Sequence, residues 1–448
     1  MPLLRLSDSE LFRADSLSWI MAGLILFVVA HVTSYSRRYL AGDRNFRRQR
    51  RDVLLLAAGV LVMVFADHLL VFLAGWITSN LLLVTLMIHK SQWNAARNAG
   101  LLAFRTFGMG FFFLAGGFWL LAESADTASI HGITTVTDRP PMVFIGLVLV
   151  ALAAMIQSAS WPFHRWLMSS LNSPTPVSAL MHAGLVNGGG FLLVRFAPLY
   201  LAQPTLLHGL FVAGLITAVV GTFWKLLQPN VKRMLACSTM GQMGFMLMQC
   251  GMGLFAPAVS HLCWHGVFKA YLFLNTGSVV QEKRRTVSAG PTTPLRLALT
   301  CVAGAMGSVA FTMVSGIGFN MTDTRCVMIG LAFMTAFQLA SGSLQKPFNG
   351  FSLIAVPFLG MGAGALYGLS IRLVETAIGS IEGTHPQPID AVYVAGLAVI
   401  VLVWIAMNLN VAVRLQSVTA WKRFYIAALN GSQPHPQTVT ATRTSYQY

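Results

Sequence analysis

The chain has few charged residues and few cysteines, and both shortages limit what kind of protein it can be. Only 10% of its 448 residues are charged, whereas a soluble domain carries about 25%. The five cysteines form no Cys-x-x-Cys pair, so we expect no disulfide framework, zinc site or iron–sulfur cluster. A glycine-rich dinucleotide fingerprint is also absent. We therefore expect no cofactor, no metal and no catalysis by this chain alone.

Acidic residues are scarcer than basic ones, at 14 against 30, and the formal charge is +16. A charge of this size can indicate a nucleic-acid partner. Here, however, the arginines cluster in short loops between apolar runs. That distribution is typical of the cytosolic loops of membrane proteins, so we expect no nucleic-acid binding.

Long apolar runs are abundant, and hydrophobic residues make up 55% of the chain. Runs of about 20 apolar residues are long enough to cross a bilayer. The sequence therefore predicts an all-α polytopic membrane protein with about thirteen transmembrane helices. The predicted spans are 17–35, 53–67, 69–88, 99–121, 143–161, 174–195, 206–224, 235–252, 255–280, 297–318, 326–344, 350–371 and 391–413.

Loop charges predict the topology of these spans. The loop 37–52 carries seven arginines, which places it in the cytosol, and alternation then places the C-terminus there too. We expect residues 1–16 to be extracytosolic and 17–413 to form the transmembrane domain. Residues 414–448 are predicted to be a cytosolic interfacial helix followed by a disordered tail from Ser432.

One predicted span contains His261, His265 and Lys269, spaced four apart and therefore on one helix face. A charged group in hydrocarbon costs about 2.5–3.5 kcal/mol on insertion scales, so such a row must face protein, water or an ion path. His-x3-His is also a metal-ligand spacing, and simple polar packing is a further alternative. No carboxylate or thiolate shares the face, and Lys269 would repel a cation. A proton relay is the interpretation we favour.

Three prolines flank the end of one predicted span and the start of the next, at Pro162, Pro174 and Pro176. Proline removes a backbone donor and can break a helix at membrane depth, where the freed carbonyls must face protein or water. Broken helices are a pointer to ion paths in transporters. The alternative is that these prolines simply mark ordinary helix ends.

Four segments resemble signature strings of the antiporter-like subunits of respiratory complex I and of multisubunit cation/proton antiporters. They are 64–76 (VFADHLLVFLAGW), 158–195 (with PFHRW and SPTPVSALMHA), 232–245 (KRMLACSTMGQMGF) and 261–278 (HLCWHGVFKAYLFLNTGS). The resemblance covers about residues 12–285. It implies two inverted five-helix repeats, about 53–195 and 206–344, each with a broken helix and a half-channel for protons.

The resemblance also implies which residues could form a polar path. Matching positions are Asp67, Arg105, His182, Lys232, His261, His265 and Lys269, with Lys269 at the family's central lysine. Several keep a structural alternative: Asp67 could cap a helix hinge, His182 could be a satisfied core histidine, and Arg105 could be structural. Lys225 lies near the cytosolic end of its span, where it could join the path or simply snorkel.

Departures from the family pattern are equally specific. The family's glutamate after Gly-Trp is Ile77 here, and its partner lysine is Gln157. A carboxylate–lysine pair has thus been lost as a unit, which avoids leaving one buried charge unpaired. Beyond Thr286 the match fades.

The best fit is to the DabB-type subunits of bacterial inorganic-carbon transporters, which are short members of this family. That resemblance implies a multi-pass protein of the bacterial inner membrane that conducts protons. It also implies a large cytosolic zinc-dependent partner resembling a β-carbonic anhydrase. Two alternatives stay open: an antiporter-like subunit of a respiratory complex or Na+/H+ antiporter, and a non-conducting membrane anchor for a partner protein.

Overall fold

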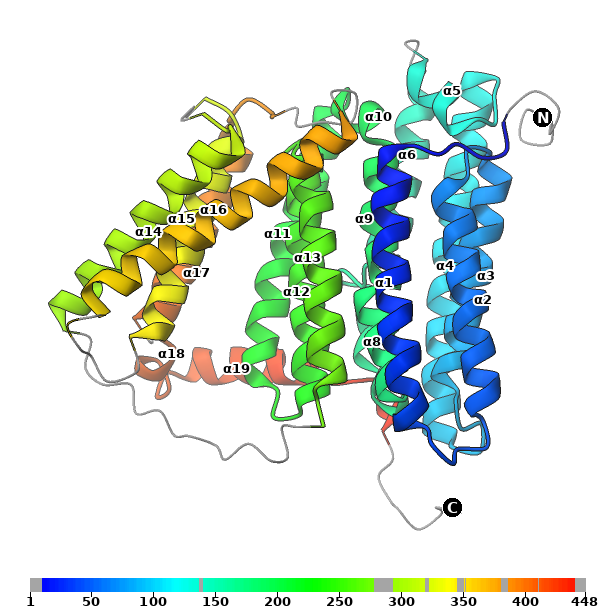
Figure 1. Cartoon of the computed structure of the whole chain (residues 1–448), viewed down its shortest axis with the longest axis horizontal. Coiled ribbons are helices and arrows are strands. Elements are labelled where there is room, and N and C mark those ends of the chain that lie inside the picture. The colour runs from blue at the N-terminus through cyan, green and yellow to red at the C-terminus, as the bar shows by residue number, and fades with distance from the viewer. Residues whose placement is uncertain are drawn as a thin grey trace.

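In the computed structural model every regular element of the described residues is a helix (Figure 1). The described residues are 10–136, 140–277, 293–318, 322–344, 350, 352–379, 386–409 and 411–439. The longer helices are α1 (Ser16–Tyr39), α2 (Phe46–Phe65), α3 (Leu69–Met87), α4 (Asn94–Ala125), α6 (Pro141–Gln157), α11 (Pro204–Leu227), α12 (Val231–Gly251), α13 (Phe255–Leu274), α14 (Pro294–Ser315), α15 (Arg325–Ser343), α16 (Ser352–Ile378), α17 (Ala391–Asn408) and α19 (Thr419–Gly431). The shorter ones are α5 (Ile130–Thr135), α7 (Arg165–Met168), η2 (Ser170–Asn172), α8 (Thr175–Ala183), η3 (Leu185–Asn187), α9 (Gly188–Arg195), α10 (Ala197–Leu201), α18 (Val411–Arg414) and η5 (Pro436–Thr438).

Each of the thirteen predicted spans coincides with one of these helices, or, for 174–195, with the interrupted run α8, η3 and α9. The predicted all-α polytopic fold is therefore confirmed. Within the described residues, nine helical segments are long and apolar enough to cross a membrane by length and composition. The remaining predicted spans correspond to α2, α6, α12 and α13. The first six residues of α2 include four arginines, α6 is shorter, and α12 and α13 carry polar side chains. The predicted end of the ninth span and the basic loop 283–285 lie outside the described residues.

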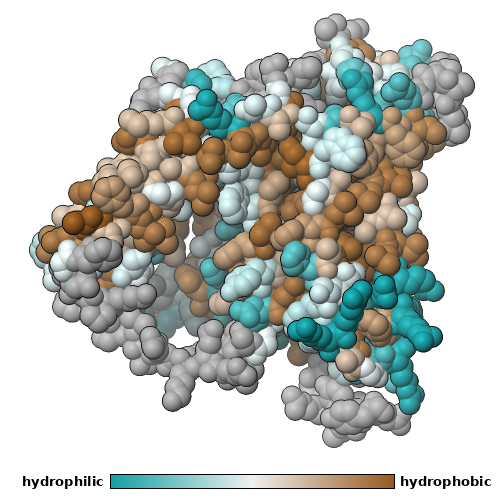
Figure 2. Space-filling model, viewed as in Figure 1, coloured by the Kyte–Doolittle hydropathy of each residue, from teal (hydrophilic) through white to brown (hydrophobic). Residues whose placement is uncertain are grey.

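The helices form a bundle from which α14 to α17 lean away (Figure 1). The arginine-rich turn between α1 and α2 lies at the same end of the molecule as α18 and α19, whereas α5 and α10 lie at the opposite end. Figure 2 shows a broad apolar belt on this face, with hydrophilic residues gathered toward both ends. The chain is thus a multi-pass membrane protein with its basic loops on the side of the C-terminal helix.

Two interruptions fall in the predicted first repeat. The first separates α6 from α7 and contains Pro162, while Pro174 is the residue that precedes α8 and Pro176 lies in its first turn. The second, at η3, contains no proline. Its freed carbonyls are satisfied by side chains: Asn187 donates to Ala183 O at 2.9 Å, and Gln157 donates to Leu185 O at 3.2 Å. Such pairing is required of irregular backbone inside a membrane protein.

The predicted second repeat differs, because α11, α12, α13, α14 and α15 each run without interruption over the ranges given above. The broken helix that the resemblance implied for each repeat is therefore present among the described residues only in the first. No proline lies inside any of α12, α14 or α15 beyond the first turn, so nothing in their sequences removes an internal backbone donor.

Close glycine contacts hold α11 against α12. A Cβ on Gly221 would lie 2.4 Å from the backbone nitrogen of Gly241, and one on Gly244 would lie 2.4 Å from that of Ala218. No side chain fits at these positions, so the two backbones pack directly. Small residues serve this purpose widely between membrane helices. The contact fixes α12, which carries part of the site described below.

The expected disorder from Ser432 is wrong for the residues up to Val439, and 440–448 lie outside the described residues. Ser432 accepts a hydrogen bond from Gln228 at 2.7 Å, and Gln433 accepts one from Arg233 at 2.9 Å. The carbonyl of Thr438 accepts from Asn172 at 2.9 Å. Polar composition suggested a solvated segment, but the helix ends at this end of the molecule supply hydrogen-bond partners that composition does not reveal.

Candidate functional site

The predicted polar row lies on α13, which packs against α8 and α12. Lys269 is 1% exposed and His265 is 4% exposed, while His261 is half-buried. The rings of His261 and His265 stack with their centroids 6.0 Å apart. The spacing of four therefore does place the three side chains along one face, and that face is turned into the protein.

Lys269 has one hydrogen-bond acceptor within the described residues. Its Nζ donates to the Leu235 carbonyl of α12 at 3.3 Å. No carboxylate in the described part of the chain forms an ion pair with it. Burying an ammonium group without a counter-ion costs several kcal/mol, which a purely structural side chain would not need to incur.

A chain of hydrogen bonds links Lys269 to His182 across α12. The Leu235 carbonyl that accepts from Lys269 also accepts from the Thr239 hydroxyl at 3.0 Å, and that hydroxyl lies 3.1 Å from His182 Nδ1. A hydroxyl has one proton to donate. When Thr239 donates to Leu235, Nδ1 of His182 must be the donor to Thr239. A carbonyl accepts hydrogen bonds but passes no proton on, so this link positions the His182 ring and Lys269 on opposite sides of the same acceptor.

His265 forms a second contact between α13 and α8. Its Nε2 donates to the carbonyl oxygen of His182 at 3.1 Å, because a carbonyl can only accept. Gly266 makes this approach possible, since a Cβ there would lie 2.9 Å from the Ala183 carbonyl. The His182 ring also stacks on Phe273 with centroids 4.2 Å apart. His182, Thr239, His265 and Lys269 thus form one connected cluster.

A cavity of about 220 Å³ lies beside this cluster, between α12 and α13. The basic row lines it together with Ser238 and Gln242, and Trp264 and Phe268 stand at its exposed side. Nε2 of His261 is buried with no hydrogen-bond partner among the residues that the structure describes. A cavity of this size holds several waters, and these have polar partners on both helices. All three side chains of the row therefore line one cavity.

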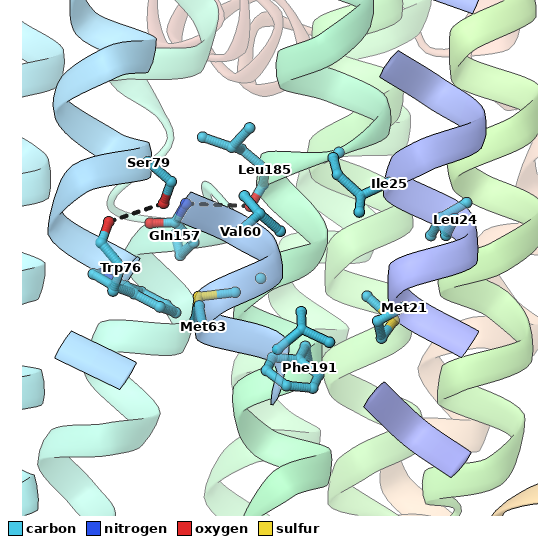
Figure 3. Close-up of a pocket in the computed structure, with 13 residues that line it drawn as sticks. Met21, Leu24, Ile25, Val60, Met63, Trp76, Ser79, Gln157, Leu185 and Phe191 are labelled. Carbon is cyan, nitrogen blue, oxygen red and sulfur yellow. Dashed lines mark hydrogen bonds between the residues drawn. The ribbon is translucent and has the colours of Figure 1, made fainter. Parts of the chain in front are cut away.

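The corresponding place in the first repeat is neutral. Gln157, at the end of α6, donates to Asn80 Oδ1 of α3 at 3.0 Å, and both residues are 4% exposed. Figure 3 shows Gln157 between Trp76 and Leu185, in a pocket whose other walls are mainly aliphatic and aromatic. Where the family pattern has a carboxylate and a lysine, this chain thus has a neutral amide pair joined by a hydrogen bond.

The remaining predicted residues form no hydrogen bond with this cluster within the described part of the chain. Asp67 is buried but accepts from Ser129 Oγ at 2.5 Å and from the His131 backbone nitrogen at 3.0 Å, which holds α5. Lys232 donates to the Ser173 carbonyl at 3.1 Å, just before α8. Arg105 and Lys225 are exposed. The Asp67 contacts fit the structural alternative given for that residue.

Three residues that contribute to the two polar centres were missed in the sequence: Thr239, Asn80 and Asn187. Thr239 stands inside one of the quoted signature strings, beside Ser238, so the resemblance offered a signal. Asn80 lies one helical turn after Ile77, the position of the lost glutamate. Asn187 had no such signal, because the interruption that it stabilises is not marked by proline.

At the opposite end of the molecule, Asp15 and Arg195 form a clamp between the start of α1 and the end of α9. Arg195 is 8% exposed and donates to Asp15, to Ser18 Oγ at 2.9 Å and to the Val64 carbonyl at 3.1 Å. Burial by itself would raise the pKa of Asp15, but the Arg195 charge and the hydrogen bonds from Arg195 and Ser18 lower it overall. The clamp is structural.

Many membrane-crossing helices, an interrupted first repeat and a buried basic row define an antiporter-like membrane subunit. The chain belongs to the NADH:quinone oxidoreductase/Mrp antiporter transmembrane family, whose sequence model matches residues 66–317. Residues 9–48 also match the N-terminal family described for chain 5 of NADH-ubiquinone oxidoreductase (complex I). The resemblance stated from the sequence is thus confirmed.

Relatives of the chain are named as transporter subunits. "Probable inorganic carbon transporter subunit DabB1" of Halothiobacillus neapolitanus is 39% identical over 280 residues, covering 60% of this chain and 50% of the relative. "Probable inorganic carbon transporter subunit DabB" of Bacillus subtilis is 33% identical over 382 residues, covering 83% of this chain and 68% of the relative. The chain therefore spans only about half to two thirds of these relatives.

The fold is similar to a chain in the structure titled "Structure of Mrp complex from Dietzia sp. DQ12-45-1b". The TM-score is 0.60 at 21% sequence identity, with 94% of this chain and 52% of that chain covered. At this identity the likeness concerns the fold alone.

Proposed function

We propose that the chain is the proton-conducting membrane subunit of an inorganic-carbon uptake complex in a bacterial inner membrane. In this proposal a cytosolic partner, a large zinc-dependent protein resembling a carbonic anhydrase, acts on CO2 or bicarbonate. Proton or cation flux through the chain supplies the energy. The relatives named as inorganic carbon transporter subunits support the choice of this class.

The observation that carries the proposal is the buried basic cluster of α13. Lys269 has no counter-ion within the described residues, yet it is buried in a basic row that lines a cavity of about 220 Å³. His182 is joined to the same carbonyl through Thr239. A buried amine next to titratable rings and water is the arrangement needed to take up and pass on a proton. Polar packing alone would be served by neutral side chains.

The test is the Lys269→Ala variant, expressed with its partner in cells that require bicarbonate for growth. We expect growth rescue in air to be lost while the tagged chain still co-purifies with the partner. Lys90→Ala is a matched control, because it removes the same side chain from an exposed position after α3, outside the candidate path. Undiminished rescue by Lys269→Ala would overturn the proposal.

The membrane-anchor alternative rests on the neutral first repeat, where no charged pair stands at Ile77 and Gln157. On that view the chain holds a partner at the membrane and conducts nothing. Uptake of labelled inorganic carbon by cells carrying the complex distinguishes the two, because an uncoupler should stop coupled uptake. Uptake that persists at zero proton-motive force would favour the anchor.

The other alternative is an antiporter-like subunit of a respiratory complex or a Na+/H+ antiporter. It is favoured by the family description, which includes both. Purification of the tagged chain from its own cells distinguishes this alternative from the carbon transporter. Several further membrane subunits would support the antiporter reading, and a single large zinc-containing partner would support the carbon transporter.

A further inference from the structure

An apolar groove lies where the C-terminal helix α19 passes the end of α11, apart from the basic cluster of α13. Its volume of about 560 Å³ falls in the usual range of ligand pockets, roughly 300–1,000 Å³. Phe223, Leu226 and Leu227 form the α11 wall. Trp421, Tyr425 and Ile426 form the α19 wall. In Figure 1, α19 runs across the ends of the spanning helices rather than parallel to them.

Aromatic contacts hold the two walls together. The Phe223 ring lies 5.2 Å from that of Phe424 and 6.2 Å from that of Trp421, measured between centroids. The groove is therefore a feature of the packed protein. Its rim nevertheless leaves large apolar side chains uncovered: Leu226 is 61% exposed and Ile426 is 56% exposed. Apolar surface of this kind at the edge of a membrane protein is normally covered.

Charge around the groove is of one sign. Lys422 lines it, and Lys225 stands one turn or less from the α11 wall residues. The sequence contains no aspartate or glutamate in 204–251 or in 391–448. A ligand that suits this site has an apolar part for the groove and a negative part for Lys422.

We propose that this groove binds an anionic glycerophospholipid, with an acyl chain between α11 and α19 and the headgroup phosphate at Lys422. Amphipathic helices with basic and aromatic residues, such as α19, lie at the boundary between the headgroups and the acyl chains of a bilayer. A basic residue near the surface strengthens attraction to anionic lipid by about fivefold in affinity. A peptide segment of a partner would need acidic residues at the rim and an apolar residue in the groove, whereas lipid supplies both parts from the surrounding membrane.

The test measures lipids retained by the purified chain with its partner, after equilibration with equal amounts of phosphatidylglycerol and phosphatidylcholine. Native mass spectrometry should detect retained phosphatidylglycerol at least fivefold in excess. Lys422→Gln should remove that preference, and Ile426→Trp should fill the groove and reduce retention of both lipids. Arg423→Gln is the matched control, because it removes an exposed positive charge from the same helix but not from the groove.

Several outcomes would overturn the proposal. They are equal retention of the two lipids, an Arg423→Gln effect as large as that of Lys422→Gln, and unchanged retention in Ile426→Trp. A co-purifying peptide that cross-links to position 426 in place of lipid would also overturn it. Circular dichroism of each variant checks that the helices are intact. The lipid proposal does not depend on proton conduction, so the two can fail separately.

Discussion

The two repeats place chemically opposite groups at their polar centres. In the first, Gln157 and Asn80 form a neutral amide pair at 3.0 Å in mainly apolar surroundings (Figure 3). In the second, Lys269 is buried next to two histidines and linked to a third through Thr239. An amide pair takes up or releases no proton near neutral pH, whereas an amine and imidazoles can exchange one. On the proposed function, the proton path lies in the predicted second repeat, and the predicted first repeat contributes neutral packing.

The largest expected effect on proton flux comes from comparing two double variants, one for each polar centre. His261→Leu/His265→Leu should lower proton flux through the reconstituted complex by at least 100-fold, which is a barrier increase of roughly 2.7 kcal/mol. Asn80→Leu/Gln157→Leu should leave flux within about threefold. Removing both partners of a hydrogen bond is nearly neutral, although the Leu185 carbonyl then loses a donor, at about 1–3 kcal/mol of stability.

Flux is read with a pH-sensitive dye in proteoliposomes, and stability from thermal unfolding. Equal losses of flux in the two double variants would contradict the contrast between the repeats. Such a result would mean that protons also pass the amide pair through water molecules in the predicted first repeat.

A second prediction restores the missing charges of the first repeat. Ile77→Glu alone should destabilise the protein by about 3–5 kcal/mol, because it leaves a carboxylate unpaired beside an apolar cavity. Adding Gln157→Lys should recover most of that loss. Asn80, one turn from Ile77, already contacts residue 157, so the new side chains can meet. The yield of folded protein in detergent and its unfolding temperature measure both effects.

If the double variant stays as unstable as Ile77→Glu, residues 77 and 157 do not face each other, and the assignment of the lost pair is wrong. Ile77→Gln is the control for size and polarity without charge. The unfolding temperature of Ile77→Gln should lie between those of wild type and Ile77→Glu.

A third, smaller effect is expected at the link between His182 and Lys269. Thr239→Val keeps the shape of the side chain but removes the hydroxyl that joins His182 Nδ1 to the Leu235 carbonyl. Proton flux should fall about tenfold, on the scale of one lost hydrogen bond of about 1–1.5 kcal/mol. Thr239→Ser should restore it. Ser79→Ala, which removes a hydroxyl bonded to the Trp76 carbonyl in the first repeat, should change nothing.

Most of the fold could be predicted from apolar runs, because a membrane span needs about 20 apolar residues and the chain shows thirteen such runs. The spacing of His261, His265 and Lys269 likewise predicted their common face. Other features depend on tertiary contacts that periodicity does not encode. Arg105 matches a family position yet lies exposed, since the sequence does not say which face of α4 is buried. Asn187 stabilises an interruption that contains no proline, and the segment after Ser432 is held in part by partners far away in the chain.

The smallest expected effect concerns the structural clamp of the first repeat and depends on pH. The pKa of Asp15 is lowered in the folded protein, since the Arg195 charge and hydrogen bonds outweigh its burial. A carboxyl with a depressed pKa contributes stability that is fully present above its unfolded pKa, about 3.9, and is lost as the pH falls through the folded value. The unfolding temperature of wild type should therefore exceed that of Asp15→Asn by a constant amount from pH 7 to pH 5. The difference should shrink below about pH 4. A difference that already vanishes between pH 7 and pH 6 would point to a titrating histidine instead, and the clamp would then not be the Asp15–Arg195 ion pair.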